Sequence, residues 1–119
     1  MSVKANSLKN NSSKNKLIQK EITSILGSID DEIKISYDKD DYSVNVSVPI
    51  TFSIPYMSNK NAQRVIYSKI LESLISRDFN VKIHLSDDKT IFNITWLSDE
   101  EKKDIEYQNI LLAKYTIKQ

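Results

Sequence analysis

Acid–base or nucleophilic chemistry in this chain would have to centre on its one histidine, His84, because the sequence contains no cysteine. A serine such as Ser86 could be activated by His84 if a carboxylate lay behind the imidazole. His84, however, occupies a polar position in an alternating stretch, where the side chain of a strand faces solvent. We therefore interpret it as a surface histidine, and the sequence predicts no catalytic residue and a non-enzymatic protein.

The carboxylates are the other groups that could do chemistry. One histidine and no cysteine exclude an ordinary zinc site. Acidic clusters at residues 30–32, 38–41, 87–88 and 99–101 could in principle hold magnesium or calcium, but each stands at an expected turn or helix start, where acids serve the backbone. A single glycine also excludes the glycine-rich loops that cradle phosphates. We expect no metal and no cofactor.

The clearest elements lie between Asn59 and Trp96. Apolar residues at intervals of four predict a helix from Asn59 to Arg77 or Asp78, capped by Ser58 or Asn59 and closed by Asp78 in a left-handed conformation. These residues are Ala62, Ile66, Ile70 and Leu74. Residues 79–85 and 90–96 then alternate between apolar and polar side chains around an acidic turn at 86–89, which predicts a hairpin.

Helices are also expected at both ends of the chain. An apolar stripe predicts a helix of about 14 residues from Ser13, ended by Gly27, the only glycine. Near the C-terminus, Ser98 and Glu101 have the spacing of a capping box, which predicts a helix to about Lys114.

A long alternating stretch precedes the middle helix. Residues 33–37 and 42–54 alternate around a turn at 38–41 and predict a second hairpin. Pro49 cannot donate a ladder hydrogen bond, so it requires an edge position, a bulge or a split of the long strand. The element order is therefore α-ββ-α-ββ-α or α-βββ-α-ββ-α. Either order predicts an α+β fold, a two-layer sandwich in which helices cover one face of an antiparallel sheet of four to five strands.

Length and charge predict the domain organisation. With 119 residues the chain is expected to form a disordered basic arm at residues 1–12 and a single α+β domain at 13–119. Residues 1–20 carry five lysines and no acid, which leaves 12 bases against 16 acids, a charge of about −4, for the remainder. Because the sequence shows neither a signal peptide nor an apolar run long enough for a membrane, we expect a cytoplasmic or virion location and no membrane contact.

Two hypotheses for the function follow. The first is an interaction or structural protein that binds itself, as a homo-oligomer, or a protein partner, through a neutral strand edge around Pro49. The residues of this edge are Ser47, Pro49, Thr51 and Ser53. The alternative is nucleic-acid binding by the basic arm and the outer side of the middle helix. Its candidate contacts are Lys4, Lys9, Lys14, Lys16, Lys20, Lys60, Arg64 and Lys69.

Overall fold

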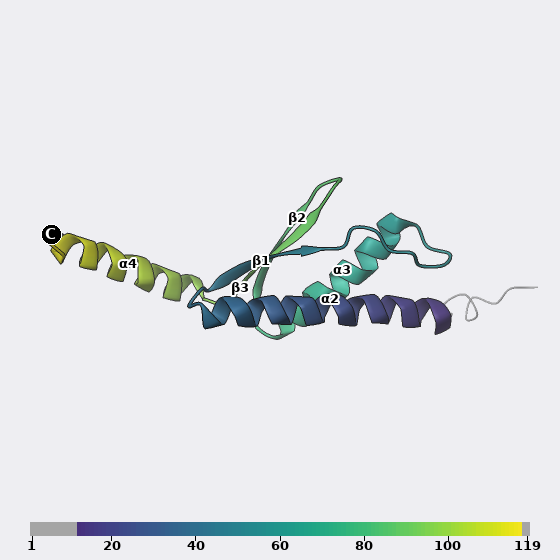
Figure 1. The fold of residues 1–119 in the computed structure, drawn as a ribbon, viewed down its shortest axis with the longest axis horizontal. Coiled ribbons are helices and arrows are strands. Elements are labelled where there is room, and N and C mark those ends of the chain that lie inside the picture. The colour runs from purple at the N-terminus through teal and green to yellow at the C-terminus, as the bar shows by residue number, and fades with distance from the viewer. Residues whose placement is uncertain (1–11, 118–119) are drawn as a thin grey trace, which may run out of the picture.

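The computed structural model describes residues 12–117, and this part of the chain is an α+β structure of three helices and a three-stranded antiparallel sheet (Figure 1). The elements in chain order are α2 (Ser12–Asp38), β1 (Ser43–Val48), α3 (Asn59–Ser76), β2 (Asn80–Leu85), β3 (Thr90–Thr95) and α4 (Asp99–Tyr115). Except for Ser12, the basic arm expected at residues 1–12 lies outside the described residues.

The sheet has the order β1-β3-β2, so the last strand in sequence is the central one. Val46 of β1 and Ile83 of β2 both pair with Phe92 of β3, and these three side chains share one face of the sheet. Asn45 and Lys82 both pair with Asn93 on the opposite face, which is polar. This alternation leaves only one face of the sheet to be buried.

Helices α2 and α3 pack against each other and against the apolar face of the sheet, α2 over β1 and α3 over β2. The largest side chains without solvent exposure come from both helices and from β3, namely Ile29, Ile66, Ile70, Leu74, Phe92 and Ile94. The ring of Tyr67 meets those of Phe52 and Phe92 edge to face, with centroids 6.0 and 5.6 Å apart. One core therefore holds α2, α3 and all three strands.

The local signals of the central stretch are confirmed. The side chain of Ser58 accepts a hydrogen bond from the Asn61 amide at the start of α3, and Asp78 follows the end of the helix with φ at 66°. The expected turn between β2 and β3 is closed by a hydrogen bond from the Ser86 amide to the Lys89 carbonyl. Ser98 caps α4 by accepting from the Glu101 amide.

The first helix is longer than the sequence predicted. Instead of ending at Gly27, α2 continues to Asp38, so the strand expected at residues 33–37 is wrong and the turn at 38–41 follows a helix. Ile33 lies four residues after the buried Ile29 and packs against the core, because the same side chains also fit a helical stripe. Gly27 is exposed within the helix, where glycine is tolerated at a cost of about 1 kcal/mol relative to alanine.

Pro49 ends the long strand instead of dividing it. Strand β1 stops at Val48, and residues 49–54 belong to no strand, so neither expected topology is present. The described chain has the order α-β-α-ββ-α, with three strands in place of the expected four to five. Phe52 and Ile54 are nevertheless buried, which shows that the alternation predicted burial correctly without predicting sheet pairing.

Helix α4 projects away from the rest of the described chain (Figure 1). No residue of α4 is buried, and it packs on none of the other described helices and strands. The two-layer arrangement with all helices on the sheet is therefore not what the described residues show. The radius of gyration is 20.1 Å, whereas a compact domain of this length has about 13 Å. None of the described helices has the length and apolarity needed to cross a membrane.

Replacing Gly27 by alanine tests the continuity of α2. A Cβ at this position has no neighbouring atom within 4 Å. The Gly27→Ala variant should therefore be more stable by about 0.5–1 kcal/mol in urea denaturation, because alanine favours the helix interior. Ser28→Gly, at the next exposed position, is the matched control and should destabilise the protein. A destabilising Gly27→Ala would show that the helix ends there, as a left-handed glycine requires.

Candidate functional site

The hydroxyl of Ser86, which would have to pair with His84 for nucleophilic chemistry, bonds to Asp88 and to the Lys89 carbonyl. His84 is exposed on the polar face of β2, opposite Ile91. The hydroxyl of Ser86 lies 2.9 Å from a carboxylate oxygen of Asp88, within the hairpin turn. The hydroxyl therefore stabilises the turn, and the side chain beside it is a carboxylate and not the imidazole of His84.

Three of the four acidic clusters lie where the sequence suggested, at turns or a helix start, whereas the cluster at residues 30–32 lies within α2, because this helix continues past Gly27. Asp30 forms an ion pair with Arg77 at 2.9 Å and so joins α2 to the end of α3. Asp40 follows α2 with φ at 63°, and Asp99 lies in the first turn of α4. Within residues 12–117, no three side chains of the kinds that bind metals are close enough to hold an ion.

The candidate nucleic-acid contacts are distributed over two helices. Lys16 and Lys20 line one shallow hollow on α2, whereas Lys60 and Arg64 line another beside α3. Lys69 forms an ion pair with Glu72 at 3.5 Å. Lys14 lies in the first turns of α2, whereas Lys4 and Lys9 are outside the described residues. Nucleic-acid binding stays a prediction.

The residues of the expected strand edge have two different environments. Ser47 belongs to β1, which is an edge strand of the sheet. Pro49, Thr51 and Ser53 are exposed in the segment that follows, outside the sheet. An exposed edge can accept another strand, so strand addition at β1 also stays a prediction.

Side chains of α3 hold the backbone of this segment. Asn59 accepts a hydrogen bond from the Phe52 amide and donates one to the Ile50 carbonyl, both at 2.8 Å. Gln63 also donates to Ile50, and the hydroxyl of Tyr67 donates to the Pro49 carbonyl. The segment therefore obtains from α3 the hydrogen bonds that a neighbouring strand would otherwise supply.

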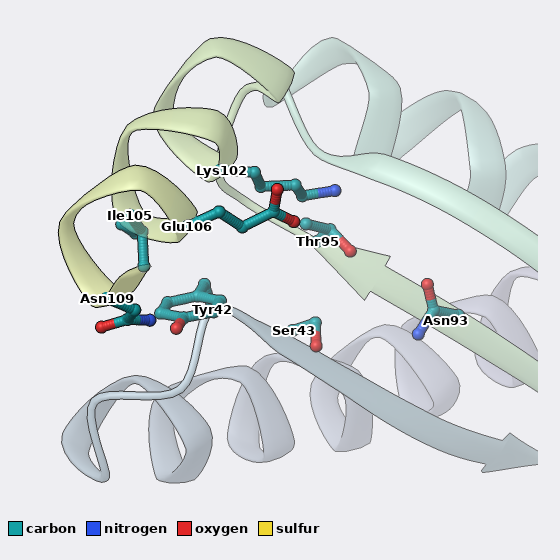
Figure 2. A pocket seen from close by; sticks show the side chains of 8 residues that line it. All are labelled: Tyr42, Ser43, Asn93, Thr95, Lys102, Ile105, Glu106 and Asn109. Atoms are coloured by element: carbon teal, nitrogen blue, oxygen red, sulfur yellow. The ribbon is translucent and has the colours of Figure 1, made fainter. Parts of the chain in front are cut away.

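A polar hollow separates α4 from the outer face of the sheet. Figure 2 shows that α4 contributes one side of this hollow and that the other comes from the ends of β1 and β3. Its lining residues are Tyr42, Ser43, Asn93, Thr95, Lys102, Ile105, Glu106 and Asn109. It contains no histidine and no pair of carboxylates, and its volume of about 330 Å³ is open to solvent.

The other side of α4 carries an exposed apolar surface, which we call the α4 stripe. Its residues are Tyr107, Leu111 and Tyr115, together with Leu112 at the border with the side that faces the sheet, because Leu112 lies seven residues after Ile105. Tyr107, Leu111 and Tyr115 recur at intervals of four and therefore lie on one side of the helix, away from Ile105 and Asn109, which face the sheet (Figure 2). Leu112 is 65% exposed and Tyr115 is 73% exposed. The two-layer sandwich that the sequence predicted would instead have placed this helix on the sheet.

A second apolar surface lies between α3 and the end of β2. The α3–β2 groove has a volume of about 380 Å³ and is lined by Lys60, Gln63, Arg64, Tyr67, Ser68, Leu71, Ile83 and Leu85. Its floor is apolar, its charged residues are both basic, and Leu85 is 67% exposed. Leu85 has the inward position of its strand, yet no described helix covers it.

No protein-family model, curated protein or solved structure matches this chain. The class that the described residues define is a small α+β structure with a one-sided sheet and a projecting apolar helix.

Removal of the Asn59 side chain tests how the segment after β1 is held. Asn59→Ala removes two hydrogen bonds to the backbone, so it should destabilise the protein by about 1–2 kcal/mol and increase proteolysis between residues 49 and 58. Asn61→Ala, in the same helical turn, is the matched control and should have less than half that effect. Equal effects of the two variants in denaturation and limited proteolysis would contradict this role of Asn59.

Proposed function

We propose that this protein is a non-enzymatic interaction module that binds another protein surface through the α4 stripe. The observation that carries the proposal is a helix of 17 residues without one buried side chain. A helix of this length has marginal stability alone in water, and most helices in proteins are stabilised by packing of an apolar face. Docking of the stripe on another protein would supply that packing.

Burial of the stripe would provide enough free energy for association. Each large apolar side chain that leaves water contributes about 1.5–3 kcal/mol. The outer face of its own sheet is mostly polar, because Asn45, Lys82 and Asn93 face outward there and Ile91 is the one large apolar side chain on that face of the described strands. The elongated shape of the described chain supports the same proposal, since α4 adds surface without adding to the core.

The expected two-layer arrangement is part of this proposal. Helices α2 and α3 cover the apolar face of the sheet, and the amphipathic α4 would complete a helical layer only on docking. The docking surface belongs either to a second copy of this chain or to a different protein.

Charge placed on the stripe should prevent docking. The double variant Leu111→Glu/Leu112→Glu should weaken association by about 30-fold or more, which is the equivalent of about 2 kcal/mol. Ala113→Glu introduces a carboxylate on the opposite side of the same helix and is the matched control, expected to change association by less than about 3-fold. Sedimentation equilibrium and light scattering measure the association, and amide hydrogen exchange reports whether α4 is protected in each variant.

If the partner is a different protein, photo-crosslinking from position 111 can identify it, with position 113 as the control. A photo-reactive phenylalanine analogue in place of Leu111 should give one discrete adduct in cells, whereas the analogue in place of Ala113 should not. The proposal would be contradicted by a monomeric protein with equal adducts from both positions, or by association that tolerates Leu111→Glu/Leu112→Glu.

A further inference from the structure

We infer that the surface on which α4 docks is a second copy of this chain, and that the α4 helix of each copy lies in the α3–β2 groove of the other. This inference rests on the proposed function and names its partner. It pairs two apolar surfaces that the described structure leaves without a protein contact, the α4 stripe and the groove.

The groove has the shape and position that a helix requires. Leu71 of α3 and Ile83 and Leu85 of β2 form an apolar channel between a helix and the edge of the sheet. The exposed Ile75, 56% accessible, lies one turn after Leu71 and extends the apolar surface. Because α2 covers β1 and α3 covers β2, the position beyond α3 is where a third helix would complete the layer.

Charge favours this pairing over contact between two α4 helices. Helix α4 has five acids and three lysines, a net charge of −2, and four of the acids lie in its first two turns. The groove has Lys60 and Arg64 on its rim and no acid among its lining residues. An acidic helix on a basic rim is attracted, whereas two α4 helices side by side repel each other.

A helix from the same chain does not reach this groove in the arrangement observed. Helix α4 begins just after Thr95, whereas Leu85 pairs with Thr90 at the other end of β3. From there α4 projects away from the sheet (Figure 1). In a two-fold dimer the exchange is reciprocal, so both stripes and both grooves are covered and the assembly is closed.

Charge placed in the groove tests the inference. Leu85→Glu puts a carboxylate on the apolar floor and should weaken dimerisation by about 30-fold or more, as a central contact of an interface does. His84→Glu, the matched control, adds the same charge on the neighbouring residue, which faces the polar side of the sheet, and should change dimerisation by less than about 3-fold. Both positions are exposed, so circular dichroism and thermal unfolding should show that both variants fold.

A disulfide between copies tests the geometry, because the natural chain has no cysteine. One sample of protein with Leu112→Cys and another with Ser68→Cys are mixed and oxidised, and a mixed disulfide dimer should form. A mixture that contains the Ala113→Cys variant in place of the Leu112→Cys variant should not form the mixed disulfide, since Ala113 faces away from the stripe.

Three results would overturn the inference. They are a wild-type protein that stays monomeric at high micromolar concentration, a Leu85→Glu variant that dimerises like wild type, and a disulfide between two copies of Leu112→Cys in place of the mixed one. The proposed function would survive each of them if Leu111→Glu/Leu112→Glu still removed the remaining association or the photo-adduct. If Leu111→Glu/Leu112→Glu left both the association and the photo-adduct unchanged, the inference and the proposed function would be overturned together.

Discussion

The packing of α2 and α3 on the apolar face of β3 is the contact on which the rest of this structure depends. Phe92 and Ile94 of the central strand have no exposed surface, and they meet fully buried residues from both helices. Strands β1 and β2 are attached to the core through their ladders with β3. Strand β1 is separated in the sequence from the β2–β3 hairpin by the whole of α3, so no local turn brings it to the sheet, and this apolar contact buries one face of all three strands.

Helix α3 connects the core to the surfaces around it. Its buried side includes Ile66 and Ile70, whereas polar side chains in its first half bind the backbone after β1. A third side of the same helix forms a wall of the α3–β2 groove. Tyr67 takes part in all three, because its ring lies in the core, its hydroxyl binds Pro49 and its edge lines the groove. Changes in the packing of α3 would therefore alter the groove.

The groups that could have done chemistry have structural roles. Ser86 and Asp88 bond to each other in the hairpin turn, Asp30 joins two helices, and Asn93 donates a hydrogen bond to Asn45 at 2.7 Å across the polar face of the sheet. What distinguishes the described surface is instead apolar area on α4 and in the groove. Exposed apolar area of this kind is typical of surfaces that bind other proteins.

Local signals in the sequence determined the caps at Ser58 and Ser98, the hairpin of β2 and β3, and the lengths of α3 and α4, because each depends on residues within one or two turns. Alternation also predicted that Phe52 and Ile54 are buried. The tertiary structure decided three other points: that α2 continues through Gly27, that hydrogen bonds after Pro49 come from α3, and that α4 does not cover its own sheet. The reason is that an amphipathic pattern shows which side chains must leave water but not which surface will receive them.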